Sequence, residues 1–450
     1  MLVMALSQIE SAKLGHLLRR AGFGARPEEW DAYARLGVAG TTDALLHPER
    51  APDHLGSVLK DIDGDFVDFH NMDSVKMWWL YRIAHTQRPL EEKMTLFWHN
   101  HFATANYKVD NPAWMWGQNE TFRANALGNF RTMLKAVSRD PAMLVWLDGA
   151  DNRKGRPNEN YGRELLELFT MGVHGGYTEQ DVKEAARAFT GWRFDRDSST
   201  FSFDAGQHDD GPKTFLGQTG NFNGDDIIDI VARHPSTAHF LCTKLFKFFI
   251  SDTPTPADTA PFERVYFNSG YDVRAVVGAM LTSGAFYAPA AMYSKIKSPV
   301  EMVMTTVRTL DVPMSALNYL PGTLRSMGQD LFNPPNVKGW TEGQSWMNTM
   351  TLMERVNFIN QVVREMGNRG EFSDKLHGAI ARAGMPVNTP EAAVNALWTT
   401  FMPGRQPSVQ TRAALTAYAS NGWKPGEARF ENKSSGLVRL ILSAPEYQLA

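Results

Sequence analysis

Three stretches of the sequence combine histidines, carboxylates and amines in patterns that could support acid–base or metal chemistry. The first, at residues 98–102, carries two histidines separated by one asparagine. Residues two apart on a helix point to different sides, so His99 and His101 could bind one metal only if the helix ends near Asn100. His208 and nearby carboxylates would then complete the site for a divalent metal. The alternative is that one imidazole is a hydrogen-bonded core residue and the other lies at the surface.

The second stretch is an acidic helix that begins after residue 158. Glu164 and Glu167 share one face of this helix with Asn160, and Arg163 is close enough to pair with a carboxylate. Two carboxylates in one cavity push their pKa values apart, as acid–base catalysis requires. We therefore predict Glu159, Glu164 and Glu167 as catalytic candidates and Asn160 and Arg163 as substrate-binding candidates. The alternative is an ordinary solvated helix face.

The third stretch, residues 207–213, lies on a segment too long for a simple connector. Functional groups often lie on such loops. His208 beside Asp209 could act as an oriented base, and Lys213 could neutralise an anionic group. Trp192, just upstream, could provide a stacking platform for a sugar ring. The alternatives are an ordinary polar turn and a core tryptophan.

The elements that must position these residues are mainly helices. Acidic residues in the first turn favour a helix over residues 90–101. Asn158 is a good N-cap for a helix over 159–171, and Gly172 is a natural stop. A near-match to a capping box starts another helix, which ends at Gly191.

Alternation typical of strands is scarce. It is clearest at residues 192–194 and 200–203, which predict a hairpin. We predict a mainly α fold, a large multi-helix body with a small β-hairpin insertion near residues 192–216. The polar pocket would lie in a main helical domain, residues 1–290, and residues 291–450 would form a C-terminal helical subdomain or continue the same domain.

Composition narrows the function classes. The 450 residues include 46 Lys and Arg against 49 Asp and Glu, a formal charge of −3, which argues against a nucleic-acid or anionic-membrane binder. A single cysteine, Cys242, rules out an intramolecular disulfide.

No apolar run reaches the roughly 18–20 residues of a membrane span, and polar residues from Ser7 onward interrupt the run that an export signal needs. We therefore expect a cytoplasmic protein without an integral membrane segment, or a mature form whose leader is missing.

Several motifs together resemble the DUF1800 family of bacterial proteins of unknown function, along nearly the whole chain. The matching stretches lie at residues 16–24, 97–104, 157–172, 177–192, 208–213, 234–249, 297–301, 334–340 and 443–449. The resemblance implies no established activity. It does imply a sulfatase-like neighbour protein as a partner and an extracytoplasmic location, and its motifs coincide with the three polar stretches. We therefore expect those stretches to form one site.

Three functions remain open from the sequence. The first is a hydrolase acting on a polar polymer such as a glycan, with Glu164 or Glu167 as general acid and a second carboxylate as base or nucleophile. The second is a metal- or haem-binding oxidoreductase that uses His99, His101 and His208. The third is a non-enzymatic binding or assembly protein in which the polar clusters are buried networks.

Overall fold

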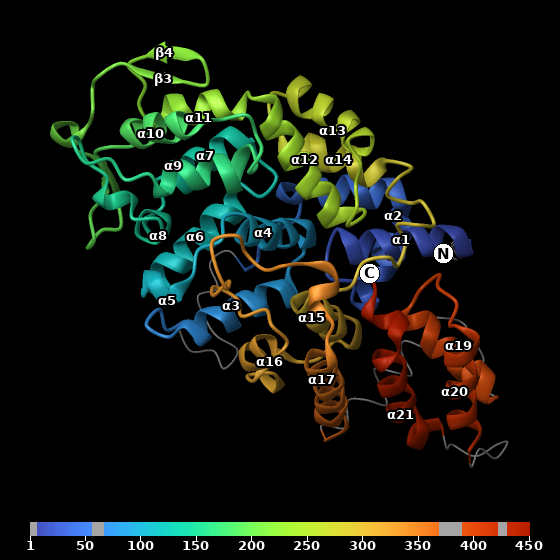
Figure 1. The fold of residues 1–450 in the computed structure, drawn as a ribbon. Coiled ribbons are helices and arrows are strands. Elements are labelled where there is room, and N and C mark those ends of the chain that lie inside the picture. The colour runs from blue at the N-terminus through green and yellow to red at the C-terminus, as the bar shows by residue number, and fades with distance from the viewer. Residues whose placement is uncertain (1–6, 56–66, 369–388, 422–429) are drawn as a thin grey trace.

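The computed structural model describes residues 7–55, 67–368, 389–421 and 430–450, and these are mainly helical, as predicted (Figure 1). No helix within these ranges is both long and apolar enough to cross a membrane. The α-helices, in chain order, are α1 (Gln8–Arg20), α2 (Pro27–Leu46), α3 (Met72–His85), α4 (Pro89–His101), α5 (Asn106–Val109), α6 (Pro112–Ala124), α7 (Phe130–Ser138), α8 (Pro141–Trp146), α9 (Asn160–Glu164), α10 (Glu179–Ala188), α11 (Gly224–Ala232), α12 (Pro235–Phe249), α13 (Pro256–Asn268), α14 (Val273–Thr282), α15 (Pro299–Leu310), α16 (Leu320–Ser326), α17 (Thr349–Asn368), α19 (Pro390–Phe401), α20 (Val409–Ser420) and α21 (Phe430–Ser443).

Local capping explains where the predicted helices start. The predicted helix over residues 90–101 is present as α4, which begins at Pro89, with acidic residues in its first turn. The helix predicted from Thr178 is present as α10. There the Thr178 hydroxyl accepts from the backbone N–H of Asp181, and the Asp181 carboxylate accepts from the backbone N–H of Thr178.

The acidic helix differs from its prediction in one respect. Its first part is α9, but residues 165–170 form a π-helical turn, η3 (Leu165–Thr170). Asn158 caps its start, since its side-chain oxygen accepts from the Asn160 backbone N–H at 2.9 Å. Gly172, with φ +80°, follows its end, as predicted. The spacing of apolar residues along the sequence does not show that a helical turn contains one extra residue, so the sequence predicts a continuous α-helix.

Two short hairpins carry the β structure. The predicted one pairs β1 (Trp192–Phe194) with β2 (Phe201–Phe203). The second pairs β3 (Lys213–Phe215) with β4 (Gln218–Gly220), where the sequence predicts only a long loop. Its two-residue turn has φ of 46° at Leu216 and 74° at Gly217. Positive φ at both positions is the geometry of a type I′ hairpin turn. Phe215 is the one large apolar residue in these two strands, so they show no apolar–polar alternation in the sequence.

The hydrophobic core surrounds α4, which lies near the centre of the molecule in Figure 1 and contacts α2, α3 and α6. Trp79 and Trp98 are completely buried there. Beyond residue 290, α15 and α16 pack against α3, while α17, α19, α20 and α21 pack on one another. The Lys297 ammonium also donates to the Tyr447 carbonyl oxygen at 2.7 Å, which ties the two ends of this region together. The division of the chain at residue 290 stays a prediction.

Candidate functional site

A cavity of about 480 Å³ lies at the C-terminal end of α4. Its walls come from the last turn of α4, the end of α12 with the turn after it, and a loop over residues 338–344. Pockets for small ligands commonly have volumes of about 300–1,000 Å³. The lining residues are Phe97, Asn100, His101, Lys244, Lys247, Asp252, Thr253, Lys338, Trp340, Glu342, Gly343 and Gln344.

Asn100 joins the helix wall of the cavity to the loop wall. Its side-chain oxygen accepts from the backbone N–H of Trp340 at 2.7 Å, and its amide nitrogen donates to Oε1 of Glu342 at 3.0 Å. The loop can come this close because residue 339 is glycine. Its φ is +81°, and a Cβ there would lie 2.2 Å from the Asn100 Oδ1 atom. One asparagine therefore fixes both the course of the loop and the position of a carboxylate.

His101, the last residue of α4, contributes a ring nitrogen with no partner. Its Nε2 atom lies 3.0 Å from the carbonyl oxygen of Phe169. A carbonyl only accepts, so Nε2 carries the proton and Nδ1 of the neutral ring carries the lone pair. Nδ1 is buried and has no hydrogen-bond partner among the described residues. Burial, and then the nearby ammonium of Lys244, hold the pKa of His101 well below its usual value, so the ring is neutral at pH 7.

The acceptor that orients His101 comes from the π-helical turn η3. The last four carbonyls of a helix have no partner within the helix, and Phe169 supplies one of them. The chain then turns at Gly172, where a Cβ would lie 3.0 Å from the Phe240 ring. Single π-helical turns inside α-helices occur frequently at functional sites. Here the turn fixes which nitrogen of His101 carries its proton.

Three lysines give the cavity an excess of positive charge. In the part of the chain that the structure describes, the ammonium groups of Lys244, Lys247 and Lys338 make no ion pair. Asp252, which also lines the cavity, forms an ion pair with Lys295. Burial lowers the pKa of Lys244 to about 8, so this amine is still mainly charged at pH 7. Unpaired cations around a cavity of this size are suited to an anionic ligand.

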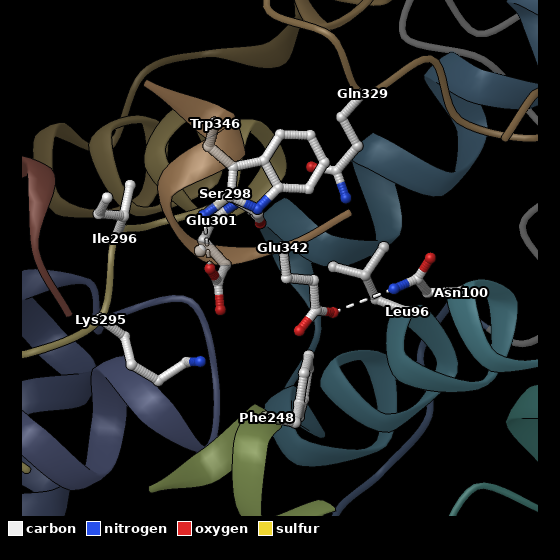
Figure 2. A pocket seen from close by; sticks show the side chains of 11 residues that line it. Leu96, Asn100, Phe248, Lys295, Ile296, Ser298, Glu301, Gln329, Glu342 and Trp346 are labelled. Atoms are coloured by element: carbon white, nitrogen blue, oxygen red, sulfur yellow. Dashed lines mark hydrogen bonds between the residues drawn. The ribbon is translucent and has the colours of Figure 1, made fainter. Parts of the chain in front are cut away.

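A recess of about 30 Å³, enough for about one or two water molecules, adjoins the cavity (Figure 2). The recess and the cavity share Asn100, Glu342 and Gly343. Figure 2 shows the carboxylates of Glu301 and Glu342 and the ammonium of Lys295 turned toward the same space. The recess thus adds the Glu301 carboxylate to the polar groups of the cavity, which already include Glu342.

These two carboxylates differ in pKa. Burial acts to raise the pKa of Glu301, but the Lys93 ammonium, which forms an ion pair with it, helps to hold that pKa at about 2. Glu342 is accessible to solvent from the cavity, yet partial desolvation between the walls raises its pKa, and Lys295 opposes this shift. Carboxylates whose environments push their pKa values apart are the usual acid and base of an active site. Glu342 is therefore suited to donate a proton, and Glu301 remains ionised.

Of the predicted catalytic glutamates, two lie electrostatically close to the cavity. Glu164 and Glu167 are half-buried. Burial and the charge of Glu167 raise the pKa of Glu164, while Arg163 and the cavity residue Lys338 lower it. Neither glutamate lines the cavity itself. They therefore contribute charge near its edge.

The remaining predicted residues of the acidic helix form surface ion pairs. Arg163 donates to Glu179 at 2.7 and 2.8 Å and to Glu159 at 3.1 Å. Asn160 is exposed, and its amide donates to Asp148 at 3.0 Å. None of the three predicted residues lines the cavity at the end of α4. Exposed pairs of this kind contribute little to stability, about 0–1 kcal/mol each.

The third predicted stretch forms a local network in which each group has its own partner. Nδ1 of His208 donates to the carbonyl oxygen of Thr190 at 2.9 Å. The Asp209 carboxylate accepts two hydrogen bonds from Arg187, at 2.8 and 3.1 Å. The Lys213 ammonium donates to the Asp209 carbonyl oxygen at 2.5 Å. This stretch does not line the cavity at the end of α4, so the predicted convergence of all three stretches is not what the structure shows.

Trp192, predicted as a stacking platform, is a core residue. It is 4 % exposed, and its ring meets the edges of Phe189 and Phe201 at centroid distances of 5.0 and 5.1 Å. The guanidinium of Arg139 lies 5.4 Å from the ring centroid. No face of the indole is therefore free for a sugar.

His99 has a structural role in the core. Its Nε2 atom accepts from the backbone N–H of Phe332 at 3.0 Å, which anchors the chain that leads to the loop wall. Burial lowers the pKa of His99 to about 3. Glu92, on the same face of α4, binds other side chains instead, including the guanidinium of Arg123 at 2.7 and 3.0 Å.

The predicted metal ligands His99, His101 and His208 are not gathered around one point. Among residues 7–55, 67–368, 389–421 and 430–450, no three or more His, Cys, Asp or Glu side chains are placed to hold a metal ion. Each of the three imidazoles has instead a backbone partner. No arrangement here favours the metal alternative over the others.

Several residues of the cavity were missed in the sequence. Asn100, Lys338 and Trp340 belong to motifs that support the family resemblance, but were not singled out as site residues. A glycine between Lys338 and Trp340, in a motif with two prolines, is a signal of a constrained loop that could have drawn attention to them. Lys244 looks like any lysine on an amphipathic helix, and nothing in the sequence separates it from a solvated one.

Comparison with known proteins supports the resemblance seen in the motifs. A protein-family model described as "Protein of unknown function (DUF1800)" matches residues 16–449. No curated protein and no solved structure matches the chain. Because the family match covers nearly the whole chain, the protein belongs to the DUF1800 family.

Proposed function

We propose that this protein is a hydrolase that acts on an anionic substrate in the cavity at the end of α4, with His101 as the base that activates water. The observation that carries the proposal is the Nδ1 atom of His101, which has no partner among the described residues and is buried in the wall of a cavity whose three lysines make no ion pair there. Its partner Phe169 fixes the proton on the other nitrogen. A histidine with one nitrogen oriented by an acceptor and the other free is arranged as in many general bases.

Substrate binding would make His101 a stronger base. Lys244 lowers the pKa of His101, because a second positive charge nearby disfavours the imidazolium. An anionic group bound between the lysines offsets that charge, so the pKa of His101 rises in the complex. The imidazole of His101 is thus neutral in the free protein, and its affinity for a proton increases when the substrate binds.

The protons balance with one acid and one base. His101 takes a proton from water as the water oxygen forms a bond to the reacting centre. Glu342, whose pKa is raised, gives its proton to the leaving group as the bond to that group breaks. A proton then passes through solvent from His101 back to Glu342, which restores both groups. Lys244, Lys247 and Lys338 hold the anionic group of the substrate.

The substrate class that we favour is an acidic glycan. Asn100 and Gln344 provide amide groups that suit sugar hydroxyls. The cavity volume of about 480 Å³ suits a small part of such a polymer. The anionic group would be a carboxylate, sulfate or phosphate on the sugar.

A comparison of charged and neutral chromogenic substrates tests the proposal. We expect p-nitrophenyl β-glucuronide, sulfate or phosphate to be hydrolysed, and p-nitrophenyl β-glucoside to be a much poorer substrate. Replacing the base, His101→Ala, should lower kcat about 10²–10⁴-fold, the usual contribution of a general base. The matched control is His174→Ala, because His174 is exposed and does not line the cavity.

Two results would contradict the proposal in different ways. If His101→Ala retained full kcat on a charged substrate, His101 would not be the base. If inorganic sulfate bound to the wild-type protein and none of the four substrates were turned over, the cavity would belong to a binding protein, which is the non-enzymatic alternative. Calorimetric titration with sulfate distinguishes that result from a cavity without affinity for anions.

A further inference from the structure

A second cavity, of about 390 Å³, lies away from the first one and shares no lining residue with it. It is formed by α1, the start of α2, the end of α15, and the end of α19 with the loop that follows. Three parts of the sequence that lie far apart, residues 8–31, the end of α15 and residues 399–406, thus meet around one space large enough for a small ligand.

An indole without partners forms part of its wall. Trp30, in the first turns of α2, is partly buried but does not belong to the side chains that pack in or against the core of the described chain. Within the described residues its ring forms no aromatic pair, and its N–H makes no hydrogen bond. Buried or half-buried tryptophans usually satisfy both groups. The ring and the N–H of Trp30 are therefore available to a ligand.

The acceptor beside it is also unused. Asp31 lines the cavity, is partly buried, and makes no ion pair or hydrogen bond among residues that the structure describes. The two arginines of the lining are engaged elsewhere. Arg26 donates to the Ala84 carbonyl oxygen at 2.7 Å, and Arg405 donates to the carbonyl oxygen of Glu446 at 3.1 Å. Among the described residues, Asp31 is thus the one charged side chain of the lining that has no partner at all.

The rest of the polar lining consists of neutral hydrogen-bonding groups. Gln8, Ser11 and Thr309 have side chains that, in the described chain, bond to no other residue. Gln406 adds an amide whose oxygen accepts from Arg412 and whose nitrogen is left to donate. Amides and hydroxyls both donate and accept, so together they match a ligand with many hydroxyl groups.

We propose that this cavity binds a neutral saccharide. The apolar face of a pyranose ring would lie on Trp30, and Asp31 would accept hydrogen bonds from a pair of hydroxyls. A neutral sugar is favoured over an anionic one, since the unpartnered Asp31 carboxylate would repel an anion and the other unpartnered lining groups are neutral. This inference does not depend on the proposed hydrolase, because the two cavities share no residue.

Isothermal titration calorimetry with cellohexaose, maltohexaose and xylohexaose tests the inference on the full chain. We expect at least one of the three to bind, with Trp30→Ala lowering its affinity at least tenfold and Trp30→Phe lowering it less. Asp31→Asn, which keeps the shape of the side chain, should lower the affinity about three- to tenfold. The matched control is Lys338→Ala, in the other cavity, which should leave saccharide binding unchanged.

The inference is overturned if none of the three hexasaccharides binds the wild-type protein. It is overturned equally if a bound saccharide binds Trp30→Ala and Asp31→Asn as tightly as the wild type. Loss of binding in Lys338→Ala, with binding intact in the Trp30 variants, would place the saccharide in the first cavity instead. Thermal unfolding of each variant, compared with the wild type, shows that a loss of binding is not a loss of fold.

Discussion

Two regions of this protein contain almost the same set of chemical groups, yet only one of them forms a candidate site. The cavity at the end of α4 and the stretch around His208 each combine a histidine, carboxylates and lysine. Around His208 each of these groups has a partner within the same stretch or on α10 and the residues just after it. In the cavity, Nδ1 of His101 and three ammonium groups have none within the described chain. A candidate site therefore differs from a structural network in having polar atoms without hydrogen-bond or ion-pair partners, and not in its residue types.

The largest expected effect comes from the glycine in the loop wall. In Gly339→Ala the new Cβ would collide with Asn100 at a position where φ is +81°, so the loop must move. We expect a loss of about 2–4 kcal/mol in the free energy of unfolding, from strain and from the lost Asn100 hydrogen bonds, together with loss of hydrolysis. Urea denaturation and kcat measure the two effects.

The matched variant is Gly211→Ala, in the network of the other region. A Cβ at residue 211 would meet the Nη2 atom of Arg187 at 2.8 Å, but this is the end of a flexible side chain. We expect a loss below about 1 kcal/mol and unchanged hydrolysis. Equal effects of the two substitutions on stability and on hydrolysis would contradict the distinction between the two regions.

The second prediction concerns the stability of the His208 region in acid. Arg187 helps to lower the pKa of Asp209 to about 2, from an ordinary value of 3.8. A carboxyl group whose pKa is lower in the folded protein than in the unfolded chain stabilises the fold at pH values above its unfolded pKa. This stabilisation is lost as pH falls through the pKa of the folded protein. We expect Asp209→Asn to cost about 1–2 kcal/mol at pH 6 and almost nothing at pH 2.

Urea denaturation of wild type and Asp209→Asn at both pH values gives the measurement. Asp210→Asn is the control, because the Asp210 carboxylate is 74 % exposed and its contact with Lys154 is long, at 3.7 Å. A cost of Asp209→Asn that did not depend on pH would show that the ion pair is not its source.

The third prediction compares two lysines, one from each region. Lys244 lines the cavity without an ion-pair partner in the described chain, so Lys244→Met should weaken the binding of inorganic sulfate about tenfold, or about 1.4 kcal/mol. Lys213 already donates to two carbonyl oxygens, at 2.5 and 3.1 Å, so Lys213→Met should leave sulfate affinity unchanged. Calorimetric titration decides between this outcome and an equal loss in both variants, which would remove the distinction.

The smallest expected effect is the pH dependence of anion binding. Burial lowers the pKa of Lys244 to about 8, so the amine loses its charge as pH rises through that value. We expect the affinity for sulfate to fall about threefold between pH 7 and pH 9, and this fall to disappear in Lys244→Met. An affinity that rose with pH in the wild type would be inconsistent with binding by this ammonium group.

The sequence predicts the fold better than the site, for physical reasons. Helix starts depend on local capping groups, so α4 and α10 could be placed from a few residues each. The hairpin of β3 and β4 was missed because its strands contain one large apolar residue, Phe215, and therefore show no alternation. The π-helical turn was missed because its extra residue does not change the spacing of apolar residues in a way that can be recognised in the sequence.

For the site, residue types identify candidates but not their partners. The sequence predicts His101 as a metal-ligand candidate, and the structure places it in the wall of the cavity. It gives equal weight to His208, because whether an imidazole is free depends on backbone groups that tertiary packing brings to it. Lys244 and Glu342 were missed for the same reason, since the burial that shifts the pKa of each is a property of the fold alone.

The π-helical turn also sets a limit on the length of its own segment. The Phe169 carbonyl reaches the ring of His101 only because the turn contains one residue more than α-helical pitch allows. Removing a single residue between Leu165 and Thr170 would rewind the segment by about 100° and point that oxygen elsewhere. The ring would then exchange protons freely between its two nitrogens. We therefore expect a one-residue deletion among these six positions to change the orientation of the His101 ring without changing one residue of the cavity.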